Sequence, residues 1–174
     1  MLIKKRWAAV LATALTLAGL GVAAPAVHAS EIAAGVPAFG TITQLKVVNK
    51  SSYGGYVDKT RRIAHCNVQT NGLGCSINRT ASATRTVQLS LGISRGAVAS
   101  QLGFSSATSV SVAVTCSAAS LKKGQTLVAY SVGSRHKYKV NKKVARSGVV
   151  LSNRTSNWLY AFNPHPAGIS CRVV

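Results

Sequence analysis

The sequence has almost no acidic residues. Among its 174 residues are 21 lysines and arginines but only two acids, Glu31 and Asp58. Most hydrolytic and metal-dependent chemistry relies on carboxylates, as paired acids, as the group that orients a catalytic histidine, or as ligands of hard metal ions. The composition therefore argues against most classes of enzyme and favours a cationic binding protein.

The sequence also lacks the common catalytic and metal-binding motifs. It contains no G-x-S-x-G, no H-E-x-x-H and no phosphate-binding glycine loop. A metal-independent ribonuclease can work with pairs of histidines and a lysine, without carboxylates, but His65, His136 and His165 sit in no recognisable motif. His65 adjoins Cys66, which makes zinc an alternative, yet no C-x-x-C spacing occurs. We therefore expect no catalytic residue, no metal and no cofactor.

Only the first part of the chain holds a long apolar run. Three cations at residues 4–6 precede the apolar stretch Trp7–Ala24, and Val27-His28-Ala29 offers small residues at a cleavage site. This order is typical of a secretory signal peptide at residues 1–29. A membrane anchor is the alternative, but Pro25 and the small residues after it differ from a basic stop-transfer flank. We expect a secreted, extracellular protein with no transmembrane span.

The positive charge indicates the kind of partner. Cleavage after Ala29 would remove three of the 21 cations and neither acid, so the mature chain would stay strongly basic. Such a charge favours contact with anionic surfaces. Outside a cell these are wall polymers, lipid headgroups or acidic proteins, and a dedicated nucleic-acid role is not expected.

Four cysteines, an even number in a chain expected to be exported, predict two disulfides. Three pairings are possible. Cys66–Cys75 is favoured because Asn71-Gly72 between them is a hairpin turn signal. That choice leaves Cys116–Cys171, whose longer loop should constrain the unfolded chain more.

Alternation of apolar and polar residues predicts a β-rich domain at residues 41–174. The clearest stripes are Thr84–Ile93 and Ser109–Cys116, as in half-buried antiparallel strands. Between them, Ser94–Gly103 has a capping serine, an apolar pair at i and i+4 and a final glycine, which predict a short helix. Further strands are expected at 41–49, 61–68, 73–79, 125–132, 135–141, 149–151 and 158–162. We expect a loop at 51–56, a hairpin formed by 61–68 and 73–79, and a turn at 164–168.

These elements predict an all-β fold, an antiparallel β-sandwich or barrel-like domain with one short helix and two disulfides. Residues 30–40 show no clear period and are expected to form a flexible N-terminal extension. Its apolar residues Ile32, Val36 and Phe39 are candidates for docking on the open sheet edge of a partner. The alternative is a short spacer.

A run of cations predicts an anion-binding patch. Alternation places the cations of the strand 135–141 on one side and His136, Tyr138 and Val140 on the other. The patch consists of Arg135, Lys137, Lys139, Lys142, Lys143 and Arg146. The alternative is a solvated edge strand whose lysines prevent aggregation.

Three aromatic residues near the C-terminus, Trp158, Tyr160 and Phe162, share one face of their expected strand. Such a row can form a platform that stacks on sugars or contacts a membrane. In a sandwich, an aromatic face more often belongs to the core.

The stretch LGISRGAVASQLGFSSATSVSVAVTCSAASLKKGQTLVAY, residues 91–130, resembles a pattern found in small exported actinobacterial proteins. In that pattern a short helix and an L-G-F step lead into a Ser/Val-alternating strand with a cysteine and then a Lys-Gly turn. A C-terminal Gly-x-x-Cys, here residues 168–171, closes it. Some such proteins act as adaptors in umbrella-type antibacterial toxin particles, where they link a lectin-like subunit to a toxin stalk. The resemblance implies an adaptor role and supplies no site residue.

The sequence thus predicts a secreted, non-enzymatic, cationic interaction protein. Its partner would be another secreted protein, as in a toxin complex, or an anionic cell-surface polymer. One alternative is a cationic antimicrobial protein that binds membranes or cell walls. The other is a metal-independent ribonuclease.

Overall fold

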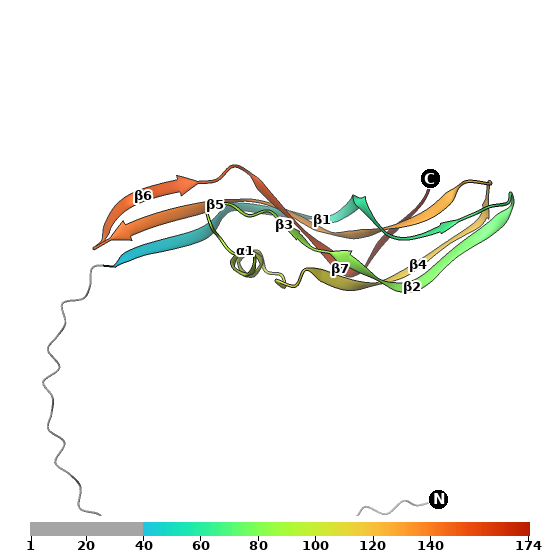
Figure 1. The fold of residues 1–174 in the computed structure, drawn as a ribbon, viewed down its shortest axis with the longest axis horizontal. Helices are drawn as coiled ribbons and strands as arrows, with labels where there is room; N and C mark the ends of the chain where they lie inside the picture. The colour runs from blue at the N-terminus through green and yellow to red at the C-terminus, as the bar shows by residue number, and fades with distance from the viewer. Residues whose placement is uncertain (1–39) are drawn as a thin grey trace, which may run out of the picture. The chain divides into compact units, whose positions relative to one another are not determined.

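The computed structural model describes residues 40–174 (Figure 1). The expected signal peptide and the docking residues Ile32, Val36 and Phe39 lie outside the described residues. The elements are β1 (Thr41–Asn67), β2 (Leu73–Thr84), β3 (Thr86–Val87), α1 (Arg95–Leu102), β4 (Ser109–Leu121), β5 (Thr126–Arg146), β6 (Val149–Thr155) and β7 (Leu159–Val173).

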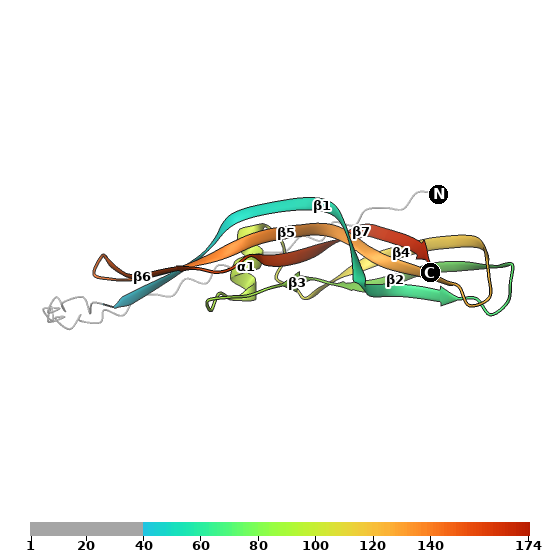
Figure 2. The same ribbon diagram turned by 90° about the horizontal axis from the view of Figure 1, so that it is seen from above.

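The strands form two antiparallel sheets. The larger has the order β1-β5-β7-β3, and β6 pairs with the C-terminal part of β5, beyond the part that pairs with β7. The smaller sheet consists of β2 and β4, which lie along the end of β5 where that strand begins (Figures 1 and 2). Within residues 40–174 neither strand order returns to its first strand, so the sheets do not close into a barrel. The predicted all-β fold with one short helix is confirmed as an open sandwich.

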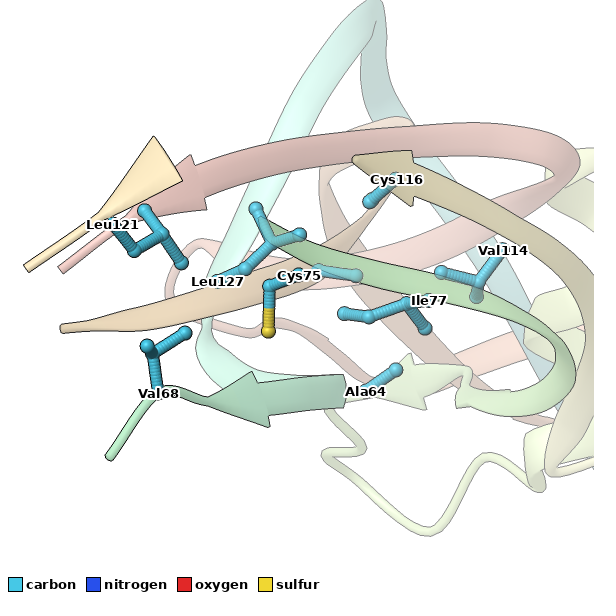
Figure 3. Packing of buried hydrophobic residues seen from close by; sticks show 9 residues of the cluster. Ala64, Val68, Cys75, Ile77, Val114, Cys116, Leu121 and Leu127 are labelled. Carbon is cyan, nitrogen blue, oxygen red and sulfur yellow. The ribbon is translucent and has the colours of Figure 1, made fainter. Parts of the chain in front are cut away.

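The main core lies between the two sheets. Strand β4 shows why it forms, because Val112, Val114 and Cys116 are buried while Ala113 and Thr115 between them are exposed. This is the stripe that alternation predicted. Figure 3 shows the side chains that converge here, which come from β1, β2, β4, β5 and the turn after β1: Ala64, Val68, Cys75, Ile77, Val114, Cys116, Leu121, Leu127 and Ala129.

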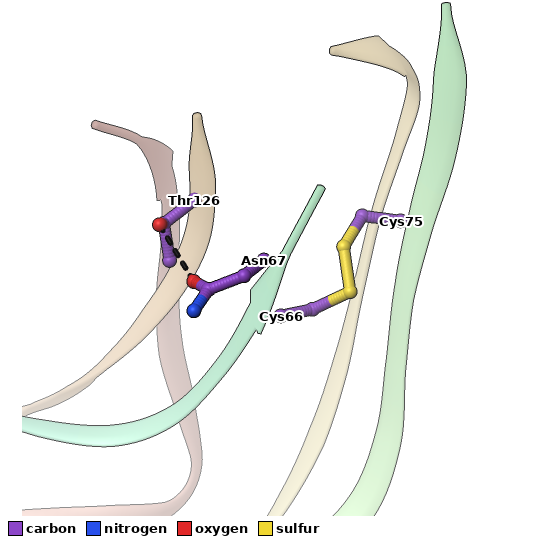
Figure 4. Close-up of a disulfide and its surroundings, with 4 residues drawn as sticks. All are labelled: Cys66, Asn67, Cys75 and Thr126. Carbon is purple, nitrogen blue, oxygen red and sulfur yellow. Dashed lines mark hydrogen bonds between the residues drawn. A yellow bond between two sulfur atoms is a disulfide. The ribbon is translucent and has the colours of Figure 1, made fainter. Parts of the chain in front are cut away.

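Both predicted disulfides, Cys66–Cys75 and Cys116–Cys171, are confirmed. The first joins β1 to β2 and the second joins β4 to β7, so each strand of the small sheet is linked to the large sheet by one disulfide. Figure 4 shows the first beside Asn67, whose Oδ1 accepts a hydrogen bond of 2.7 Å from Thr126 Oγ1. Because a two-stranded sheet is marginally stable by itself, these links hold the sandwich together.

The hairpin predicted for residues 61–68 and 73–79 is wrong, although the disulfide between them is right. Residues 62–67 pair with β5, and β2 pairs with β4. Asn71 Oδ1 accepts a hydrogen bond of 2.8 Å from Lys123 N, and Gly72 has a φ of 78°. The Asn-Gly turn therefore carries the chain from one sheet to the other. A local turn signal does not distinguish this crossing from a hairpin.

The strand predicted at Thr84–Ile93 is also largely wrong, because pairing with β7 covers only Thr86 and Val87. Gln88 ends it: its N–H donates to Tyr160 O at 3.0 Å, and its side-chain Oε1 accepts from Tyr160 N at 2.8 Å. Leu91 and Gly92 then take φ values of 56° and 84° and turn the chain toward the helix. The side chain of Gln88 thus accepts the hydrogen bond from Tyr160 N that a backbone carbonyl would accept if the strand continued.

Helix α1 forms as predicted. Ala97 N donates to Ser94 Oγ at 3.2 Å at its start, and Gly103 ends it with a φ of 81°. Val98 is fully buried and packs in a second core cluster with Tyr138 and Val140 of β5. No helix of residues 40–174 is long and apolar enough to cross a membrane.

The loop predicted at residues 51–56 and the turn predicted at residues 164–168 are wrong, because both segments lie inside strands. Residues 51–56 belong to β1, and residues 164–168 belong to β7. In β7, Pro164 lies opposite Gly133 and Ile169 lies opposite Ser131, so an advance of five residues in β7 corresponds to only two residues in β5. Bulges absorb the extra residues in both places, and a bulge tolerates the missing N–H of proline. The two strands expected at 125–132 and 135–141 are one continuous strand, β5.

Candidate binding surface on strand β5

One face of β5 carries three cations that lie over aromatic rings. Arg135 Cζ lies 4.9 Å from the ring centre of Tyr56 and 4.5 Å from that of Tyr160. Lys137 Nζ and Lys139 Nζ lie 4.3 Å and 4.8 Å from a ring of Trp158. We call this surface the cationic–aromatic strip and define it as Arg135, Lys137, Lys139, Tyr56, Trp158 and Tyr160.

The strip follows from the period of a β-strand. Tyr138 and Val140 are fully buried in the cluster with α1, so the odd-numbered residues between and beside them face the other side of the sheet. Pairing with β7 places Lys137 opposite Tyr160. The alternation predicted for residues 135–141 is therefore confirmed.

The rings hold the cations in place and leave them partly open to solvent. A cation–π contact at such a site stabilises the arrangement by about 0.5–1 kcal/mol. Trp158 is 43 % exposed, whereas Phe162 is 4 % exposed and packs edge-on against Tyr56. Of the three aromatics grouped from the sequence, Phe162 is thus a core residue, and Trp158 and Tyr160 belong to the strip.

The structure divides the six predicted patch residues. By alternation Lys143 continues the side of the strip, while Lys142 and Arg146 turn to the other side. Lys142 lies opposite Leu45 of β1 and Arg154 of β6. The strip and Lys143 therefore form one cationic row, from which Lys142 and Arg146 are separate.

A cleft of about 320 Å³ opens at the Arg135 end of the strip. Its aromatic wall consists of Tyr56, Tyr160 and Phe162, and its charged groups are Asp58, Arg61 and Arg135. Asp58 is 7 % exposed. Its Oδ1 accepts hydrogen bonds of 3.1 Å from Thr60 N and 2.5 Å from Thr60 Oγ1.

Sequence reasoning did not find this cleft. Its walls come from β1, β3, β5 and β7, which are far apart in the chain, and Tyr56 fell in a segment expected to be a loop. The one available signal was Asp58, one of only two acids in the sequence.

The three histidines within residues 40–174 do not meet in a cleft. His65 is exposed on β1, His165 lies in the bulge of β7, and His136 packs beside Phe104 with ring centres 5.3 Å apart. Burial lowers the pKa of His136 below 6.5. Among the described residues no three His, Cys, Asp or Glu side chains are grouped as metal ligands would be.

Tyr138 provides a test of the cluster beneath the strip. Its hydroxyl donates to Gln88 O, and burial raises its pKa from 10.0 to about 12. Because the folded value is the higher one, the stability from the neutral phenol is complete below about pH 10 and is lost as the pH rises toward about 12. Tyr138→Phe should lower the free energy of unfolding at pH 7 by about 1–2 kcal/mol, because Gln88 O loses its donor.

The measurement is urea unfolding of wild type and Tyr138→Phe between neutral and alkaline pH. The difference between the two should shrink above about pH 10. A constant difference across that range would contradict the buried, protonated phenol.

The chain was compared with protein-family models, curated proteins and solved structures, and none of them matches it.

Proposed function

We propose that the protein is a secreted, non-enzymatic binding protein for anionic cell-surface polymers, with the cationic–aromatic strip as its contact surface. The observation that carries the proposal is the stacking of Arg135, Lys137 and Lys139 over exposed or half-buried rings. Two disulfides are typical of proteins that work in an oxidising environment outside the cytoplasm.

The row of cations suits a polymer better than a single small ion. Residues two apart on one strand face are about 6.6–6.8 Å apart, because each residue advances the strand by about 3.3–3.4 Å. Arg135, Lys137 and Lys139 follow this spacing along β5, and Lys143 lies two such steps beyond Lys139, past Asn141. An extended chain with regularly spaced negative groups can therefore run along the strip and contact several cations at once.

The aromatic rings add two features that charge alone lacks. Their faces offer apolar area on which sugar rings can pack. They also hold the cations in fewer conformations, so less side-chain entropy is lost when a ligand binds. The adaptor role in a toxin particle remains a prediction from the sequence resemblance.

Reversing two charges of the strip tests the proposal. Lys137→Glu with Lys139→Glu should weaken retention on immobilised heparin, used as a model anionic polysaccharide, and should reduce its dependence on salt. Each cation at an anionic surface contributes about 1 kcal/mol, so the loss should be at least about tenfold in affinity. The measurement is the sodium chloride concentration at elution.

The matched control reverses Lys122 and Lys123, which are exposed in the turn before β5 and outside the strip. This double variant changes the net charge equally. If both variants elute at the same salt concentration, retention depends only on the net charge of the protein, and the strip is not a binding site.

A second candidate function is direct action on membranes. Ile42, Val149 and Leu151 are 70 %, 64 % and 58 % exposed at the end of the sheet that also carries Arg146. Apolar side chains beside cations favour contact with anionic lipid surfaces. Dye-filled vesicles containing phosphatidylglycerol separate the two functions in the same experiment: a polymer-binding protein leaves them intact, and leakage would support membrane action instead.

A further inference from the structure

The cleft at the end of the strip holds the single acidic residue of residues 40–174. Asp58 is more than nine-tenths buried, and both hydrogen bonds from Thr60 reach its Oδ1. No hydrogen bond from a described residue reaches Oδ2. Since no buried side-chain oxygen of these residues lacks a partner, Oδ2 keeps some access to solvent, and Asp58 lines the cleft. A carboxylate oxygen in that position accepts hydrogen bonds from a ligand.

The other walls of the cleft favour a sugar as that ligand. Tyr56 and Tyr160 present ring surfaces beside the nearly buried Phe162, and Arg135 lies over both tyrosine rings. A guanidinium in a fixed plane is well suited to pair with a carboxylate or phosphate group. The volume of about 320 Å³ is at the lower end of small-molecule sites, which suits one or two sugar rings.

We propose that this cleft binds one sugar unit that carries a negative group, with its hydroxyls donating to Asp58 Oδ2 and its anionic group facing Arg135 and Arg61. The inference rests on the proposed function, because it specifies which anionic polymer the strip binds: a polysaccharide with acidic sugar units. A simple polyanion such as polyphosphate can contact the strip but cannot use Asp58, since it has no hydroxyl groups along its chain to donate.

Asp58→Asn separates sugar recognition from general charge attraction, because the two give opposite results. The variant gains one positive charge, so attraction alone makes every anion bind as tightly as before or more tightly. If Asp58 accepts hydrogen bonds from sugar hydroxyls, loss of such a charge-assisted hydrogen bond lowers the affinity for an acidic disaccharide by about 10- to 100-fold. Asparagine keeps an oxygen that can accept from Thr60, so the local turn has its partner.

The probes are digalacturonate, glucose 6-phosphate and polyphosphate, titrated by calorimetry into the full mature chain. We expect Asp58→Asn to weaken the binding of digalacturonate and to leave the binding of polyphosphate unchanged or tighter. Weakening of glucose 6-phosphate but not digalacturonate would support the site with phosphate as the anionic group. Unchanged or tighter binding of both sugars by Asp58→Asn would overturn the proposal, as would wild-type protein that binds neither.

A matched pair of arginine variants keeps the test valid if Asp58→Asn does not fold. Arg61 lines the cleft and Arg62 does not, and both are exposed. Arg61→Gln should lower the affinity for digalacturonate several-fold more than Arg62→Gln does. Equal effects of the two variants would count against the cleft as the sugar-binding site.

The outcomes also separate this inference from the proposed function. If reversal of Lys137 and Lys139 abolishes heparin retention while Asp58→Asn leaves sugar binding intact, the cleft proposal fails and the strip remains a polymer site. If Asp58→Asn weakens sugar binding while the strip reversal leaves retention intact, the cleft is a sugar site on a protein whose strip has another role.

Discussion

Loss of the Cys116–Cys171 disulfide is expected to lower the free energy of unfolding by about 4 kcal/mol. The bridge closes a loop with a sequence separation of 55 residues, and the chain-entropy relation assigns about 4 kcal/mol to a loop of that size. Cys116 is 3 % exposed, so alanine is the better replacement at this position because a serine hydroxyl would be buried there. The measurement is guanidinium unfolding of the Cys116→Ala, Cys171→Ala double variant.

The other disulfide provides the matched comparison. Cys66–Cys75 has a sequence separation of 9, for which the same relation gives about 3 kcal/mol. Both bridges link the large sheet to one strand of the small sheet, so they differ mainly in loop length. A larger loss from the Cys66→Ala, Cys75→Ala variant would mean that contacts in the folded state, and not the unfolded chain, set the effect.

Gly133→Ala is expected to cost about 3 kcal/mol, at the upper end of the usual range for an overfilled site. A methyl group at Gly133 would lie 2.2 Å from Asn163 O and 2.6 Å from Pro164 Cα. Both are backbone atoms, so no side-chain rotation relieves the contact, and β7 would have to move away from β5. Arg85 Nε opposes that movement by donating to Asn163 Oδ1 at 2.7 Å.

The control is Gly96→Ala in helix α1, where an added methyl meets no atom within 4 Å. There alanine should stabilise the protein by up to about 1 kcal/mol, because it is the better helix former. Urea unfolding of the two variants measures both effects. A cost below about 0.5 kcal/mol at Gly133 would fall within the range of ordinary surface substitutions, and would show that β5 and β7 separate easily.

The local features of the fold could be read from the sequence. Ser94 and Gly103 determined the ends of α1, and the alternating valines of β4 determined its buried face. The same reasoning placed Arg135, Lys137 and Lys139 opposite Tyr138 and Val140. Capping and strand alternation depend on residues a few positions apart, so they are visible in the chain itself.

The candidate site needed more than local pattern. The cations were found from the sequence, but the rings beneath them come from β1, from the segment leading into β7 and from β7 itself, and their partners follow from strand register. The cleft could not be predicted, because Asp58, Arg135 and Tyr160 meet only once β1, β5 and β7 have paired.

Tertiary structure alone decided which strands pair. The segment before Asn71-Gly72 joined β5 and the segment after it joined β4, although the turn signal favoured pairing them with each other. Residues 84–93 alternate as well as β4 does, yet only Thr86 and Val87 pair with β7, because Gln88 and the turn at Leu91 end the strand there. By itself the sequence determined which face of a strand is apolar. Which strand each one pairs with was determined by the burial of those faces against distant parts of the chain. One apolar stripe can pack against several others, and the best-packed combination is the most stable.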